Sequence, residues 1–279
     1  MHKILVLEQR REPEYSLFTN LGLELGLQVV SLDPGAVRMA GCRPVVDLEP
    51  LPSDYAGVVV RSYRRFAVVR QIAQAFRAVG KPVLGLDPLR ASFSQDKLCD
   101  LMDLQAAAVP VPLTWARPED APRTVVVVKE NWGYGGSGVQ LLDMANVPLR
   151  NAPPLAWVNH HFQEYLEATE DWRVLVCEGK ALPWVIRRRP AVGEFRTNTH
   201  QGGALEVVPV ADFPNGLALS NIAEHAAAVL GRPCAGVDLR QGADGEPVVL
   251  EVNRTPRLRL GALTEKVVNR YLTAWARAL

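Results

Sequence analysis

Two carboxylates and an amide lie on a predicted β-hairpin near the C-terminal end of the sequence. The apolar stretches 235–239 and 247–252 are separated by a turn-rich Gly-Ala-Asp-Gly segment, which predicts antiparallel pairing. Side chains alternate between the two faces of a strand, so Glu251 and Asn253 share one face, opposite Leu250, and the hairpin brings Asp238 close to them. Hard oxygen donors gathered in this way suit Mg²⁺, which also takes phosphate oxygens and water. A sheet with one solvated polar face gives the same pattern, so both interpretations stay open.

A glycine-rich stretch, Gly-Tyr-Gly-Gly-Ser-Gly at 133–138, follows a strand predicted at 124–129. The backbone N–H groups of such a loop can approach a phosphate closely, and Lys129 at the strand end supplies a positive charge. No Gly-Lys-Ser/Thr follows, which excludes the Walker A loop, and residues 139–142 are typical of another strand. A hairpin lid over phosphates therefore fits best, with a flexible structural loop as the alternative.

Charged side chains also occur between the predicted strands in the middle of the chain. Glu164 and Asp171 flank a predicted crossover between domains, where carboxylates could bind an adenine amino group and ribose hydroxyls; strand alternation alone would make Glu164 solvent-facing. Arginines at 187–189 and the polar stretch 195–203 are suited to phosphate or carboxylate. No aromatic platform is interleaved with them, as single-stranded nucleic acids would need, and a solvated arginine face is the remaining alternative.

The composition excludes several classes of protein. The 279 residues are 48% hydrophobic and 22% charged, an ordinary globular balance, and the net charge of +1 gives no case for nucleic-acid binding. The four cysteines, at 42, 99, 177 and 234, show no Cys-x-x-Cys spacing, which argues against a zinc site or a secreted disulfide scaffold. No segment approaches the roughly 20 apolar residues of a spanning helix. We therefore expect a cytoplasmic protein with no membrane or nucleic-acid partner.

The elements that must position these residues fall into two parts. Up to about residue 90, strands at 4–7, 28–32, 58–60 and 82–84 alternate with helices at 17–25 and 67–79, which predicts a parallel α/β sheet. A helix over 94–108, with Ser94 as its N-cap, opens the second part. Beyond it we expect strands at 124–129, 162–165, 171–177 and 181–187, the hairpin, and helices at 217–230 and 263–279.

The order and spacing of these stretches resemble the ATP-grasp superfamily and, within it, the RimK-like carboxylate–amine ligases. The resemblance covers about residues 96–260. It is carried by Asp96-Lys97 at a helix start, by Phe195-Arg196-Thr197-Asn198 ahead of Gly202-Gly203, and by Gly236-Val237-Asp238 followed by Glu251-Val252-Asn253. It implies an α/β and α+β chain: an N-terminal, substrate-side parallel α/β (pre-ATP-grasp) domain at 1–90 and an ATP-grasp domain at 91–279. In the latter, a central lid subdomain (about 110–165) and a C-terminal subdomain (about 166–279) sandwich ATP.

The resemblance also implies roles for individual residues. The metal ligands are Asp238, Glu251 and Asn253. A larger set of residues would bind the nucleotide: they contact its phosphates, form the lid and the hinge, hold the ribose, or bind the reacting phosphate. They are Lys97, Lys129, Gly135, Gly136, Ser137, Gly138, Glu164, Tyr165, Asp171, Arg196, Thr197 and Asn198. Lys129 and Arg196 are the expected catalytic residues.

The chemistry implied joins a carboxylate to an amine and releases ADP. A carboxylate attacks the γ-phosphate of ATP, and an amine then attacks the acyl-phosphate. Mg²⁺, with Mn²⁺ as the alternative, and the cations of Lys97, Lys129 and Arg196 would offset the repulsion between the two anions. Closure of the glycine-rich loop would keep water from the intermediate. No side-chain nucleophile is needed, so the cysteines take no role and His160, His161 and His225 are interpreted as structural or surface residues.

The sequence departs from the family pattern near the expected substrate. Small residues and glycine usually follow the position of Asn253, whereas residues 254–259 read Arg-Thr-Pro-Arg-Leu-Arg, and Gln201 stands where arginine is frequent. Arg254, Arg257 and Arg259 could bind an unusually acidic substrate. Arg61, Arg64 and Arg65, which follow the third strand at the C-terminal edge of the first sheet, are further candidates. Surface charge is the alternative for the first group, and a solvated loop for the second.

Three functions remain open at this point. The first is a RimK-like ligase that adds glutamate or a similar amino acid to a peptide, protein or small amine. The second is a LysX-type ligase that acts on a carrier protein, and the third is a non-catalytic ATP-binding regulator. The presence of Lys97, Lys129, Asp238, Glu251 and Asn253 argues against the regulator. Related ligases often form dimers or tetramers, so a homo-oligomer is also expected.

Overall fold

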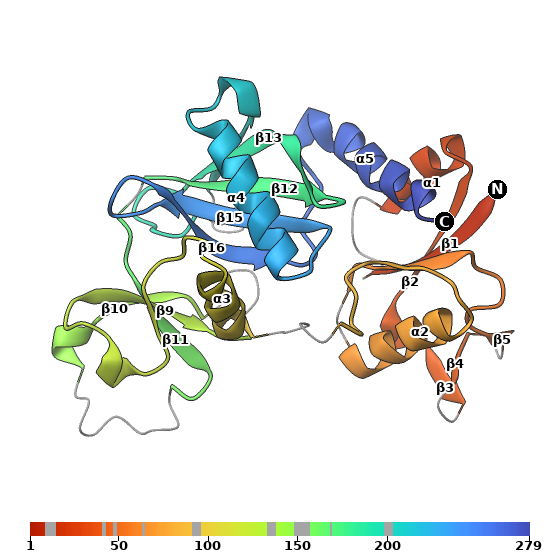
Figure 1. Cartoon of the computed structure of the whole chain (residues 1–279), viewed down its shortest axis with the longest axis horizontal. Helices are drawn as coiled ribbons and strands as arrows, with labels where there is room; N and C mark the ends of the chain where they lie inside the picture. The colour runs from red at the N-terminus through yellow and green to blue at the C-terminus, as the bar shows by residue number, and fades with distance from the viewer. Residues whose placement is uncertain are drawn as a thin grey trace.

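The structure is a computed structural model. It describes residues 1–8, 15–40, 43–46, 49–62, 65–90, 96–132, 138–147, 157–167, 169–197 and 203–279. In this part of the chain the strands form three larger sheets and one small one (Figure 1). The small antiparallel sheet, which was not predicted, joins β3 (Arg38–Ala40), β4 (Arg43–Val46) and β5 (Glu49–Pro50).

The N-terminal sheet is parallel, as the alternation of strands and helices predicts. Its order is β2-β1-β6-β7, from β1 (His2–Leu7), β2 (Leu27–Leu32), β6 (Gly57–Val60) and β7 (Val83–Gly85). Alternate residues of β1 face different helices. Ile4 and Val6 belong to the core of α1 (Tyr15–Glu24), while Leu5 and Leu7 belong to that of α2 (Phe66–Ala78). Burial on both faces explains why β1 and β6 read as continuous apolar runs.

The middle sheet is a small antiparallel one that follows α3 (Lys97–Ala106). Its order is β10-β9-β11-β8, from β8 (Thr114–Trp115), β9 (Val125–Glu130), β10 (Gln140–Asp143) and β11 (His160–Glu164). The prediction that Ser94 caps α3 is wrong. Asp96 is the N-cap, because its Oδ1 accepts hydrogen bonds from the backbone of Leu98 (2.8 Å) and Cys99 (3.2 Å).

The C-terminal sheet is antiparallel, with the order β14-β13-β12-β15-β16. Its strands are β12 (Asp171–Cys177), β13 (Lys180–Arg189), β14 (Ala204–Pro209), β15 (Ala235–Gln241) and β16 (Pro247–Asn253). One face packs on α4 (Gly216–Val229) and the other on α5 (Thr264–Arg277). The strand β14 was not predicted; the other elements lie within a few residues of their predicted bounds.

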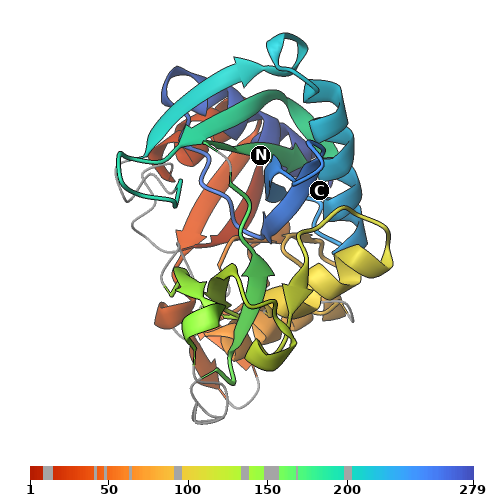
Figure 2. The same ribbon diagram turned by 90° about the vertical axis from the view of Figure 1, so that its left-hand side faces the viewer.

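The N-terminal and C-terminal sheets share one hydrophobic core. In Figures 1 and 2 the helices α1 and α5 lie side by side, and the rings of Phe18 and Trp275 stack with centroids 5.3 Å apart. The middle sheet has a separate small core around Val126, Val128 and Phe162. None of the helices in the described ranges is both long and apolar enough to cross a membrane.

Candidate active site

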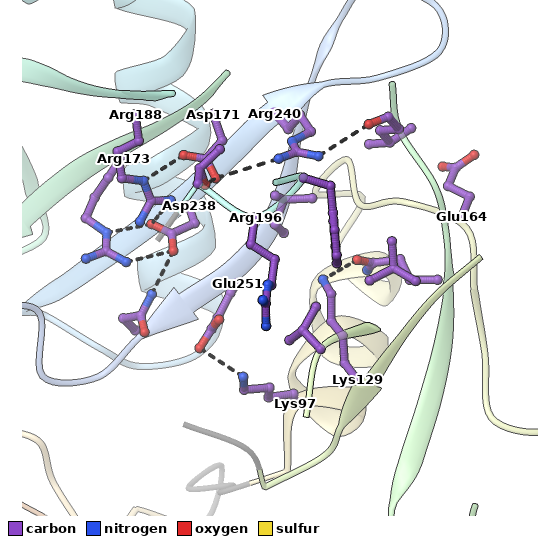
Figure 3. A pocket seen from close by; sticks show the side chains of 18 residues that line it. Lys97, Lys129, Glu164, Asp171, Arg173, Arg188, Arg196, Asp238, Arg240 and Glu251 are labelled. Carbon is purple, nitrogen blue, oxygen red and sulfur yellow. Dashed lines mark hydrogen bonds and ion pairs between the residues drawn. The ribbon is translucent and has the colours of Figure 1, made fainter. Parts of the chain in front are cut away.

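A pocket opens between the middle and C-terminal sheets. Its empty space, open mouth included, is about 910 Å³. Figure 3 shows the 18 side chains that line it. They are Lys97, Val127, Lys129, Val139, Gln163, Glu164, Leu166, Asp171, Arg173, Arg188, Phe195, Arg196, Thr197, Asp238, Arg240, Leu250, Glu251 and Asn253. The residues predicted from the hairpin, the lysine strand and the crossover therefore meet in one place.

The hairpin β15–β16 brings its three polar residues together, as predicted. Asp238 pairs in register with Glu251, and the amide nitrogen of Asn253 donates to Oδ2 of Asp238 at 3.1 Å. The register shifts directly after Asp238, since Leu239 pairs with Val249. This bulge leaves Leu250 as the extra residue of β16, and Leu250 lines the pocket beside Glu251 rather than facing away from it. Simple alternation was therefore wrong for Leu250.

Two arginines hold Asp238: Arg173, which sequence reasoning did not assign, and Arg188, one of the arginines interpreted as suited to phosphate or carboxylate. Arg173 donates to both carboxylate oxygens, at 2.6 and 2.8 Å, and Nη2 of Arg188 lies 3.2 Å from Oδ1. Burial alone would raise the pKa of Asp238, but the two guanidiniums outweigh it and lower the pKa to about 2. Arg173 lies directly opposite Asp238 in the pairing of β12 with β15, so only the strand register reveals this partnership.

The donor set around Glu251 fits a hard divalent cation. The amide nitrogen of Asn253 points to Asp238, which leaves its carbonyl oxygen for a cation. Nζ of Lys97 lies 3.5 Å from Oε1 of Glu251, too far for a strong hydrogen bond. No cluster of three or more histidine, cysteine, aspartate or glutamate side chains suited to a metal occurs within the described ranges. The oxygen set here is two carboxylates and an amide, with Glu251 and Asn253 less engaged than Asp238.

Two lysines enter the pocket from the side opposite the C-terminal sheet. Lys97 stands in the first turn of α3, and Lys129 in β9 donates to the side-chain oxygen of Gln163. Figure 3 shows both lysines converging with Arg196 and Glu251 on the same space. Burial lowers the pKa of Lys129 to about 8; nearby Glu251 raises it and Lys97 lowers it again. These residues therefore place positive charge in the pocket, which a bound anion would stabilise.

The histidine beside these lysines is structural, as predicted. His161 is fully buried, and its Nδ1 lies 2.8 Å from Oδ1 of Asn131. Burial, with the charges of Lys129 and Lys97, lowers the pKa of His161 to about 3, so the ring is neutral. The carbonyl oxygen of Asn131 accepts from the backbone of Lys97 at 2.9 Å. This contact joins the end of β9 to the start of α3.

The predicted ribose and phosphate residues line the pocket but already have protein partners. Asp171 is buried and accepts from Nε of Arg188 at 2.6 Å and from the hydroxyl of Thr197. Arg196 donates to Glu194 through Nε (3.0 Å) and Nη2 (2.8 Å). A ribose contact at Asp171 and a phosphate contact at Arg196 remain predictions. Asn198 lies outside the described residues.

The crossover from β11 to β12 joins the middle and C-terminal sheets, as predicted for the hinge. Oε1 of Glu164 accepts from the backbone of Leu113 at 2.8 Å, and the carbonyl oxygen of Leu166 accepts from Arg240 at 3.3 Å. Tyr165 between them is half-buried. The adenine role of Glu164 and Tyr165 stays a prediction.

The predicted lid loop joins β9 and β10 as a hairpin. Gln140 pairs with Val128 in antiparallel register, which confirms that a strand follows the loop. Gly138 has a φ of +71°, a left-handed backbone conformation that favours glycine. Gly135, Gly136 and Ser137 lie outside the described residues.

Of the arginines proposed for the substrate, Arg61, Arg254 and Arg257 are not among the residues that line the pocket. Nε of Arg61 lies 3.6 Å from Glu8 and its guanidinium lies over the ring of Phe18, and Nη2 of Arg254 lies 3.3 Å from Asp100. Arg61 and Arg254 thus already have protein partners, and their substrate role stays a prediction. Arg257 is exposed, and Arg64 lies outside the described residues.

Comparison with known proteins agrees with this architecture. The RimK-like ATP-grasp domain matches residues 121–269, more than half of the chain. A probable alpha-L-glutamate ligase of Methanococcoides burtonii is 32% identical over 194 residues, which cover 63% of this chain and 62% of the relative, less than two thirds of its length.

Two solved structures share the fold over nearly the whole chain. D-cycloserine synthetase DcsG superposes with a TM-score of 0.71 at 20% identity, covering 99% of each chain. The ATP-grasp ligase PsnB, solved with a phosphomimetic variant of its minimal precursor, Mg and ADP, gives 0.70 at 19% identity and covers 100% of this chain and 99% of its own. The chain thus has the ATP-grasp fold. The chain belongs to the RimK-like ATP-grasp family.

Proposed function

We propose that the chain is an ATP-dependent, ADP-forming ligase that joins a carboxylate to an amine through an acyl-phosphate. One observation carries the proposal. Lys97 and Lys129 face Asp238, Glu251 and Asn253 across a single pocket between two sheets. Cations on one wall and hard oxygens on the other are what a metal-bound polyphosphate requires.

Glu251 and Asn253 would hold Mg²⁺, with Asp238 beside them, and Mn²⁺ would suit the same oxygen donors. A metal held there would reduce the negative charge of bound phosphates. The PsnB structure contains Mg and ADP, which supports this choice of ligands for the family's fold. Direct ligation by Asp238 would compete with Arg173, so we assign Asp238 chiefly to fixing Asn253.

The cationic residues would offset the repulsion between the two reacting anions. An attacking carboxylate and the γ-phosphate repel each other, and a pocket that holds Lys97, Lys129 and Arg196 lowers that barrier. For Arg196 to reach a phosphate, its contact with Glu194 would have to yield. Lys129 would gain a full counter-charge, in place of the neutral Gln163 oxygen.

Glutamate, or a similar amino acid, is the substrate we propose first. The relative from Methanococcoides burtonii is named a glutamate ligase, and PsnB was solved with its precursor. The acceptor would be an amine, a peptide or a protein. Arg257 and Arg259 are exposed on the segment after β16, and they remain candidates for an acidic substrate. A carrier-protein substrate of the LysX type is the second candidate.

The test is ADP release with Mg²⁺, ATP and a panel of amino acids, amines and short acidic peptides. We expect ADP with one substrate pair only, and a condensed product lacking one water by mass spectrometry. Glu251→Gln should reduce turnover at least 100-fold, since a metal-bound carboxylate is lost. Glu224→Gln is the matched control, because Glu224 ties α4 to β13 away from the pocket.

A chain that bound ATP but released no ADP with the panel or with carrier proteins would contradict the ligase. If Glu251→Gln also left ATP binding unchanged, the regulator would be favoured instead.

A further inference from the structure

Three charged side chains form a buried cluster behind the pocket wall. Nη2 of Arg232 lies 2.6 Å from Oδ1 of Asp100, and Nη2 of Arg254 lies 3.3 Å from Oδ2 of the same carboxylate. The Asp100 and Arg254 side chains are each 11% exposed and that of Arg232 is 4% exposed. None of the three is among the residues that line the pocket.

The cluster joins the two elements that carry the proposed phosphate and metal residues. Asp100 lies one turn after Lys97 on α3, so the two side chains leave the same side of the helix. Arg254 directly follows Asn253. Arg232, just after α4, donates through Nη1 to the carbonyl oxygen of Val252 at 2.7 Å. The two arginines thus hold β16 on both sides of Asn253 and tie it to α3.

Such a cluster is better suited to fixing geometry than to adding stability. Burial raises the pKa of Asp100, and Arg232 and Arg254 lower it, so the carboxylate depends on both partners. Well-packed apolar side chains would stabilise a protein at least as well as a buried ionic triad. What a triad supplies is one allowed arrangement, because a displaced α3 would leave buried charges unpaired.

We propose that Asp100, Arg232 and Arg254 are positioning residues that set Lys97 on α3 at its working distance from Glu251 on β16. This inference rests on the proposed function and deepens it. It also gives Arg254 a positioning role within the protein. Lys97 then meets the phosphates of a nucleotide whose metal is held by Glu251 and Asn253.

The test is a double-mutant cycle of Arg254→Ala with Lys97→Ala, read as the Kd of the non-hydrolysable Mg–AMPPNP by calorimetry. If Arg254 acts through Lys97, Arg254→Ala weakens binding about tenfold in the wild type and less than about twofold in Lys97→Ala. Arg254→Lys keeps the charge and should recover part of the loss. Lys180→Ala, which breaks an exposed ion pair with Glu224, is the control and should leave the Kd unchanged.

Equal losses in both backgrounds would overturn the positioning role, because a merely structural arginine weakens both alike. If Arg254→Ala does not fold, Arg254→Met keeps the apolar part of the side chain, and the same cycle applies. AMPPNP binding together with no ADP production from ATP would overturn the proposed ligase activity. The double-mutant cycle could still be measured in that case. A wild-type chain that bound no nucleotide would overturn both proposals.

Discussion

At the scale of single residues, Lys129 shows how the pocket is prepared for an anion. Its ammonium group is buried beside Lys97 and Arg240, and its hydrogen-bond acceptor is the uncharged Gln163. Water and a nearby carboxylate would normally stabilise such a charge. The nearby carboxylate here is Glu251, which is shared with Lys97 and so offsets the charge of Lys129 only in part. A polyphosphate would supply the missing negative charge, so binding should favour the protonated lysine.

A pH dependence of nucleotide binding follows from this residue. Burial lowers the pKa of Lys129 to about 8, so the free protein carries the ammonium below pH 8 and loses it above. Binding needs the charge, so the affinity for Mg–ADP should be full near pH 7 and fall about tenfold by pH 9. Calorimetric Kd values at the two pH values measure this.

Lys129→Arg provides the control, because arginine stays charged throughout this range. The ligand's own titration is common to both proteins and cancels in their ratio. If the variant lost affinity with pH as steeply as the wild type, Lys129 would not be the titrating group.

The sequence singled out the residues proposed to act in the site better than it identified their partners. Lys97, Lys129, Asp238, Glu251 and Asn253 stand out by type and spacing, and the structure brings them together. Arg173 and Arg188 were missed as partners of Asp238, since an arginine in a strand has no visible partner until the strands are paired. The same holds for Arg254, whose partner Asp100 is far away in the chain.

At the scale of elements, the hairpin was predictable because strand alternation and turn residues are local signals. The bulge after Asp238 was not, because it depends on which residue of β16 is left without a partner. The edge strands β8 and β14 were also missed. The two residues of β8 are a strand only through their pairing with β11, and β14 pairs along β13 at the edge of its sheet.

The close packing at Gly236 makes the hairpin geometry testable. Gly236 pairs with Asn253, and a Cβ at this position would lie 2.8 Å from Cβ of Pro256. Gly236→Ala should therefore displace the end of β16, cost about 1–3 kcal/mol of unfolding free energy and raise the Mg²⁺ concentration for half-maximal activity. Denaturant unfolding and a Mg²⁺ titration measure the two effects.

The matched rescue is Pro256→Gly, which removes the atom that the new Cβ would meet. The double variant should regain most of the Mg²⁺ response. A Gly236→Ala protein with unchanged Mg²⁺ dependence would show that the end of β16 does not set the metal site.

At the scale of the whole molecule, the alternation of strands and helices up to about residue 90 predicted the first sheet but not how it is attached. Residues of β1, β2 and β6 share one core with β12, β13 and α5. The contact between α1 and α5 joins the two ends of the chain, and no local pattern reveals such a pairing. The N-terminal sheet is thereby held against the C-terminal sheet, which carries the proposed metal residues, while the middle sheet keeps its own core.

A shared core predicts that the N-terminal and C-terminal sheets unfold together. Trp275 is 3% exposed and stacks on Phe18, so Trp275→Ala should cost about 3–5 kcal/mol and lower Tm by about 10 °C. Scanning calorimetry should show one main unfolding transition for these two sheets, and Trp275→Ala should shift that whole transition to lower temperature. Trp132→Ala is the control, because Trp132 is 66% exposed and its loss should change stability by less than about 0.5 kcal/mol. Two separate transitions, of which Trp275→Ala moved only one, would mean that the first sheet is an independent domain resting on the ATP-grasp core.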